Sequence, residues 1–151
     1  MAVSRPMRRL LAVLQMQEEQ SRLALESAVA DLRRMEEAFK AAIERERGGR
    51  QLVAASARTG ELVDRLAGME EALAGQRHAV ALKPRIAETE LRVTSRRREF
   101  LGKRIERRQA ETLIEKTIAR DAIESGRRAQ RDVDDRFLTQ SRRTRNEVEI
   151  S

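Results

Sequence analysis

The feature that most constrains this sequence is its single interior proline, Pro84, which lies near the midpoint of the 151 residues. Proline removes a backbone donor, clashes with the preceding helical turn and disfavours helix in the residue before it. The only other proline, Pro6, follows Ser4 at a position where the start of a helix tolerates it. The sequence therefore predicts two long helices joined by one bend, with both chain ends at the same end of a rod.

A heptad stripe runs along the first half of the chain in alternating steps of four and three residues. It comprises Met7, Leu11, Leu14, Glu18, Ser21, Leu25, Ala28, Leu32, Met35, Phe39 and Ala42. Such a stripe indicates a helix that packs against another helix along its length. Four apolar residues resume the stripe before the proline, namely Leu62, Leu66, Met69 and Leu73.

We therefore expect an all-α fold, a long antiparallel two-helix coiled-coil hairpin that residues 1–151 form as one domain. The first helix is predicted over about 5–79, the bend at about 80–84 and the second helix over about 85–145. This register places Leu62 opposite Phe100 and Phe39 opposite Ile123. Gly48 and Gly49 leave a second break open, because each glycine costs about 1 kcal/mol in a helix; small residues there would also let the other helix come close.

The composition favours such a rod over a thick core. Charged residues make up 38% of the chain and aromatic residues 2%, and cysteine, tryptophan and tyrosine are absent, which is typical of long helices and coiled coils. The lack of cysteine fits a reducing compartment. The apolar run at residues 10–14 is too short for a signal peptide, and no run is long enough for a membrane span. We expect a soluble cytoplasmic protein.

The residues offer no catalytic or metal-binding constellation. His78 is the only histidine, and no cysteine is available to join it as a metal ligand. No phosphate-binding glycine-rich loop is present. Adjacent acidic residues such as Glu36 and Glu37 point about 100° apart on a helix and do not share a site. We therefore expect no enzymatic activity and no cofactor.

The net charge of +7 favours an acidic partner. Most of the basic surplus lies after Pro84, in clusters such as Arg96–Arg98, Arg127–Arg128 and Arg142–Arg143. Nucleic acid is not the expected partner, because basic and acidic residues alternate and the three phenylalanines fit the apolar stripe, which leaves no aromatic platform for bases.

The second half of the chain resembles a known family. Residues 96–138, RRREFLGKRIERRQAETLIEKTIARDAIESGRRAQRDVDDRFL, are similar to the C-terminal helix of the FliJ-like stalk proteins of bacterial flagellar and type III secretion export. The start is similar too, with a basic, leucine-rich turn at residues 8–14 before the heptad stripe. The resemblance implies a non-enzymatic hairpin like the central stalk of rotary ATPases. It also implies that the end with both termini docks in a hexameric export ATPase, while the hairpin contacts the cytoplasmic domain of the export gate and, in flagella, export chaperones.

Geometry then suggests candidate contact residues for each partner. The candidates for the ATPase are the arginines of the terminal end, Arg8, Arg9, Arg127, Arg128, Arg131, Arg142 and Arg143. The candidates for the gate lie at the expected bend and are Leu73, Val80, Leu82 and Ile86. The implied location is cytoplasmic and peripheral to the inner-membrane export apparatus, flagellar or injectisome. Two alternatives stay open: a generic coiled-coil protein that homodimerises through the heptad stripe, and a basic nucleic-acid-associated protein.

Overall fold

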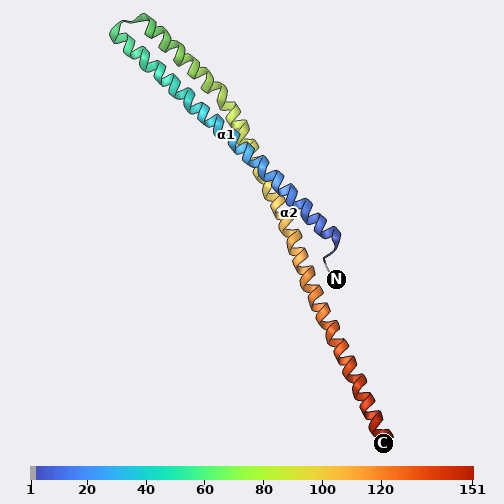
Figure 1. Cartoon of the computed structure of the whole chain (residues 1–151). Coiled ribbons are helices and arrows are strands. Elements are labelled where there is room, and N and C mark those ends of the chain that lie inside the picture. The colour runs from blue at the N-terminus through green and yellow to red at the C-terminus, as the bar shows by residue number, and fades with distance from the viewer. Residues whose placement is uncertain (1–2) are drawn as a thin grey trace. The chain divides into compact units, whose positions relative to one another are not determined.

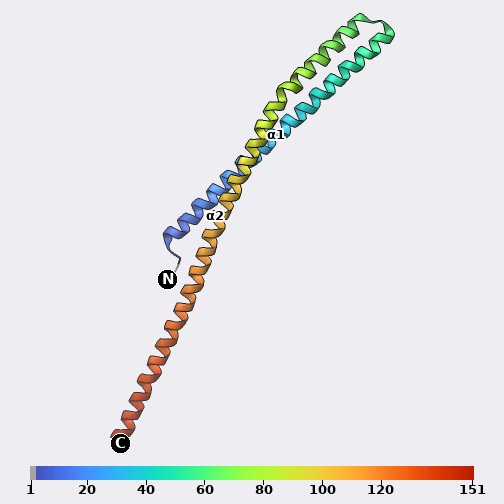
Figure 2. The same ribbon diagram turned by 180° about the vertical axis from the view of Figure 1, so that it is seen from behind.

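The computed structural model describes residues 3–151 and is all-α, as the sequence predicts. It contains α1, Arg5–Thr59, and α2, Leu62–Ile150, which pack against each other as an antiparallel hairpin (Figures 1 and 2). Contacts divide the chain into two units. One is the hairpin unit, Gln17–Arg104, and the other is the terminal unit, which joins residues 3–16 with Ile105–Ser151.

Ser4 precedes α1 and caps its start, in agreement with the sequence. Its side-chain oxygen accepts a hydrogen bond from the backbone nitrogen of Met7 at 3.4 Å, and its carbonyl accepts one from Arg8 at 3.2 Å. These bonds satisfy donors that a helix start leaves free. Pro6 lies in the first turn, where its missing donor costs nothing.

The chain reverses direction at Gly60 and Glu61, between the two helices. Gly60 has a φ of 72°, in the left-handed region that favours glycine. Its backbone nitrogen donates to the carbonyl of Ser56 at 2.8 Å, so Gly60 ends α1 in the way that glycine commonly ends helices. This turn gives the hairpin unequal helices of 55 and 89 residues.

The prediction of a bend at 80–84 is therefore wrong, and so are the boundaries of 5–79 and 85–145 for the two helices. Pro84 lies inside α2, with helix on both sides of it. A proline in a helix removes one hydrogen bond and need only kink the helix. Pro84 is exposed, so water can reach the face of α2 where that bond is lost. The packing of α2 against α1 on the opposite face keeps the helix continuous.

The packing face of α1 in the hairpin unit repeats every seven residues. Ser21, Ala28, Ala42, Gly49 and Ser56 are buried at this spacing. The heptad stripe predicted over residues 21–42 is thus confirmed as the face that meets the other helix, and it continues past Gly49. Gly48 and Gly49 do not break α1.

The packing face of α2 is made mostly of small residues. Its buried positions are Gly68, Gly75, Ala79, Leu82, Thr89 and Val93. The prediction that Leu62, Leu66, Met69 and Leu73 continue the internal stripe is wrong, because all four are exposed. Small residues take the internal positions because the two backbones approach too closely for large side chains.

Three glycines bring the two backbones into direct contact. A Cβ atom on Gly49 would lie 2.4 Å from the backbone nitrogen of Ala72. One on Gly68 would lie 2.7 Å from the carbonyl oxygen of Gly49, and one on Gly75 would lie 2.6 Å from that of Ala42. All three distances are shorter than real Cβ contacts, and the atoms met belong to the backbone, which cannot move aside as a flexible side chain can.

Polar contacts between the helices agree with this register. Thr89 Oγ1 donates to Met35 Sδ at 3.3 Å, and Lys103 Nζ donates to Gln17 Oε1 at 3.4 Å. The register predicted from a bend at 80–84 is wrong. It faced Leu62 with Phe100, and both of these residues belong to α2.

We predict that Gly49→Ala destabilises the hairpin, because the added methyl group must push α2 away from α1. Overpacking of this kind costs about 1–3 kcal/mol. Urea unfolding followed by circular dichroism at 222 nm measures the free energy of unfolding. The matched control is Gly48→Ala, whose added Cβ meets nothing within 4 Å. It should stabilise by up to about 1 kcal/mol through helix propensity alone. Equal effects of the two substitutions would contradict the close approach.

We also predict that Pro84→Ala stabilises the protein, because the alanine restores a donor to the interior of a continuous helix. The gain should be on the order of 1–3 kcal/mol, the cost of an interior proline reduced by the greater freedom of alanine in the unfolded chain. Thermal unfolding of the two proteins measures it. A loss of stability would instead indicate that the chain needs proline there for a bend.

Candidate functional site

The first candidate surface lies on α2 just after the turn. Leu62, Leu66, Met69 and Leu73 follow one another in steps of four and three residues and are 66%, 57%, 47% and 47% exposed. We call these four residues the turn-proximal surface. Where this surface meets α1, Val53, Met69 and Leu73 help to line a hollow of about 330 Å³. An exposed apolar stripe with heptad spacing suits contact with another helix.

The residues predicted from the sequence to contact the gate divide into two groups. Leu73 and Val80 are exposed, so both are available to a partner. Leu82 is only 4% exposed and Ile86 is half-buried. Leu82 therefore belongs to the packing face of α2 and cannot contact a partner while the hairpin is closed. None of the four lies at the turn, because the turn is at Gly60 and Glu61.

One exposed ion pair joins the two helices of the hairpin unit. Arg45 Nε donates to Glu71 Oε2 at 2.7 Å and Arg45 Nη2 donates to Glu71 Oε1 at 3.0 Å. The hydrogen bonds from Arg45 lower the pKa of the Glu71 carboxyl, and its positive charge lowers it further. At the turn the opposite occurs, because a hydrogen bond with Asp64 and the charge of Asp64 raise the pKa of Glu61.

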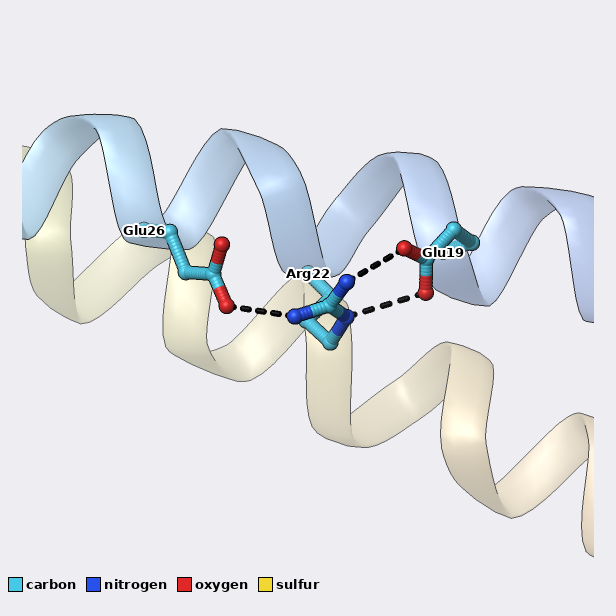
Figure 3. Close-up of polar contacts among 3 residues, drawn as sticks. All are labelled: Glu19, Arg22 and Glu26. Carbon is cyan, nitrogen blue, oxygen red and sulfur yellow. Dashed lines mark hydrogen bonds and ion pairs between the residues drawn. The ribbon is translucent and has the colours of Figure 1, made fainter.

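Arg22 is held between two carboxylates of its own helix (Figure 3). Its Nε donates to Glu19 Oε2 at 2.9 Å and its Nη1 donates to Glu26 Oε1 at 2.5 Å. The hydrogen bond to Glu19 is the main reason that the pKa of Arg22 is raised above its ordinary value. This arginine is thus already neutralised within the chain and is a poor candidate for binding an acidic partner.

The second candidate surface lies in the terminal unit. Within α2, burial ends at Asp121, and positions 107, 110, 111, 114, 117 and 121 are half-buried in the run before it. Every residue of 122–150 is exposed, and we call this segment the C-terminal stretch. It carries large apolar side chains, such as Ile123 and Phe137, which are 57% and 68% exposed. A helix with no apolar contact of its own gains little stability from propensity alone.

The seven arginines predicted to contact the ATPase all lie in the terminal unit and are exposed. They are Arg8, Arg9, Arg127, Arg128, Arg131, Arg142 and Arg143. None of them has an ion pair or side-chain hydrogen bond within residues 3–151, in contrast to Arg22 and Arg45 of the hairpin unit. These positive charges are therefore available to an acidic partner.

The structure brings together no metal-binding cluster within residues 3–151, where no group of three or more His, Cys, Asp or Glu is placed to hold an ion. His78 is exposed on α2. Neither helix, over the described part of the chain, has a segment long and apolar enough to cross a membrane.

The sequence interpretation assigned the four residues of the turn-proximal surface to the internal stripe and so did not recognise them as exposed. A second set of residues with the same heptad spacing, the small residues Gly68, Ala72, Gly75 and Ala79, is the signal that could have identified the packing face.

No family model matches the sequence, and neither the curated proteins nor the solved structures contain a match to it.

We predict that the ion pair between Arg45 and Glu71 stabilises the hairpin in a pH-dependent way. Because the folded pKa of Glu71 is lowered, this stabilisation is complete above the unfolded pKa of glutamate, about 4.3, and is lost as the pH falls through the folded pKa. Glu71→Gln should therefore lower Tm at pH 7, and the difference from the wild type should shrink towards pH 3. Glu90→Gln, an exposed change on the same helix, is the control. A difference that is the same at both pH values would contradict this role.

Proposed function

We propose that this chain is a non-enzymatic central stalk, or accessory protein, of a flagellar or type III secretion export ATPase. In this proposal the terminal unit docks in the hexameric ATPase, and the hairpin unit contacts the cytoplasmic domain of the export gate. The protein thereby links the two and works in the cytoplasm, peripheral to the inner-membrane export apparatus. Export chaperones are a further class of partner in a flagellar system.

The observation that carries the proposal is the C-terminal stretch. It is a helical segment of residues 122–150 with no buried residue, and it carries five of the unpaired candidate arginines. A subunit inside a ring must be narrow, stiff and polar on its surface, and a long charged helix meets these demands. Contacts based on charge also suit a ring that turns relative to its stalk, because they tolerate changes of partner better than tightly packed apolar contacts do.

The turn-proximal surface supports a second partner in the same proposal. Leu66, Met69 and Leu73 present an apolar stripe on the hairpin unit and are 57%, 47% and 47% exposed. Apolar patches of this kind mark interaction sites. Leu73 and Val80, named from the sequence for contact with the gate, are retained as candidates, whereas Leu82 is withdrawn because it is buried.

Homodimerisation through the heptad stripe is less well supported than the stalk role. Ser21, Ala28 and Ala42, which belong to that stripe, are buried between α1 and α2 of the same chain. A dimer that uses them requires the hairpin to open first, and the opening breaks the glycine contacts described above.

We predict that the triple charge reversal Arg127→Glu, Arg128→Glu and Arg131→Glu weakens stimulation of the export ATPase from the same organism. If each lost contact contributes about 0.5 kcal/mol, half-maximal stimulation needs roughly tenfold more of the variant. A steady-state ATP hydrolysis assay, in which the concentration of this chain is varied, measures the effect.

The matched control reverses three exposed, unpaired arginines of the hairpin unit, Arg33, Arg97 and Arg98, and so makes the same change in net charge. Circular dichroism checks that helicity is unchanged in both variants. Equal losses in the two variants, or no stimulation by the wild-type chain, would argue against the proposed function.

A further inference from the structure

An uncharged stripe runs along the C-terminal stretch. Between residues 119 and 144, steps of four and three connect Ile123, Gly126, Gln130, Val133, Phe137 and Gln140, and every position on this path is uncharged. The other positions over the same residues are mostly charged. All of the stripe is exposed, and Ile123, Val133 and Phe137 are 57%, 59% and 68% exposed. The spacing is that of a helix face that meets another helix.

Arginines border this stripe on both sides. With about 100° of rotation per residue, Arg120 and Arg127 fall beside one edge of the stripe, and Arg136 and Arg143 fall beside the other. Asp132 and Asp135 fall on the opposite side of the helix. Asp134 is the acidic residue at the edge of the stripe, and its Oδ1 already accepts a hydrogen bond from Gln130 Nε2 at 3.0 Å.

This arrangement sorts the arginines that the sequence grouped together. Arg127 and Arg143 border the stripe, but Arg128 and Arg142 lie on the far side of the helix by the same rotation. None of these four has an ion pair within the part of the chain that the structure describes. Their difference is therefore one of position alone, and a partner on the stripe reaches the first pair and not the second.

We propose that the uncharged stripe is a docking surface for an amphipathic helix of a protein partner, with an apolar centre and acidic flanks. The arginine rows pair with the acidic flanks, and Ile123, Val133 and Phe137 pack against the apolar centre. A second copy of the chain does not fit, because its own arginine rows would face these and like charges repel. A lipid surface does not fit either, because glycine and glutamine interrupt the stripe and leave few large apolar side chains to insert.

This inference rests on the proposed function in one respect, which is that the C-terminal stretch is a docking segment. Its experiment uses a synthetic peptide and no ATPase, so the two can fail separately. The probe is a fluorescein-labelled 28-residue helical peptide with leucine at the heptad core positions and glutamate at the flanking positions. A second peptide carries lysine at those flanking positions. Fluorescence anisotropy with the full chain measures the Kd of each.

The acidic peptide should bind at least tenfold more tightly than the basic one. Arg127→Glu with Arg136→Glu should weaken its binding at least tenfold, whereas Arg128→Glu with Arg142→Glu, the same change in charge on the far side, should change it less than threefold. Phe137→Ser should weaken binding at least tenfold, whereas Leu138→Ser, one residue on but about 100° around the helix, should have a much smaller effect. Circular dichroism confirms that each variant is helical.

Equal binding of the two peptides, or equal effects of the paired variants, would overturn the inference. Two alternative partners, vesicles of anionic phospholipid and duplex DNA, are tested for binding to the full chain in the same way. Tighter binding to either than to the acidic peptide would also overturn it.

Discussion

The close approach of two helix backbones is the constraint on which this structure depends. Gly49, Gly68 and Gly75 face the opposite backbone at distances that leave no room for a side chain. This contact determines which face of each helix is internal, and therefore which residues remain outside. Because small residues fill the interface, leucine and methionine side chains are left on the surface of α2 and form the turn-proximal surface. The exposed apolar surface beside the turn is thus a direct result of the way in which the hairpin packs.

Much of the fold was predictable from the sequence, but the position of the turn was not. The heptad stripe of α1 identified its packing face correctly over residues 21–42, and Ser4 marked the start of the helix. Pro84 led to a wrong prediction of the bend. A proline removes only one backbone hydrogen bond of a helix, and a long helix that packs on its other face continues through it. Gly60 carried the correct signal, but it was one of seven glycines, and only its positive φ distinguishes it from the others.

The candidate surfaces were predictable to different degrees. The exposure of the terminal arginines follows from composition, because charged side chains rarely lie inside a protein. Their lack of ion pairs does not, because Arg128 has Glu124 four residues before it and Asp132 four residues after it. Leu82 was placed wrongly because its role depends on the register, and moving the turn from 80–84 to Gly60 and Glu61 changes every facing pair. The order of the arginines around α2 was already implied by the helix predicted over about 85–145, because neighbours such as Arg127 and Arg128 lie about 100° apart on any helix. What the sequence did not show is that every residue of 122–150 is exposed, which leaves this order open to a partner.

The register of the hairpin can be tested by crosslinking, because the chain has no cysteine of its own. In the double variant Arg45→Cys and Glu71→Cys, the two thiols replace an exposed ion pair that joins α1 to α2, and a short bismaleimide should link them within one chain. In the variant Leu62→Cys and Phe100→Cys, both thiols lie on α2, separated by about 57 Å at 1.5 Å per residue, and no intramolecular link should form. Mass spectrometry after digestion identifies the linked peptides. Efficient linkage of the first pair alone agrees with a turn at Gly60; linkage of the second pair within one chain would contradict it.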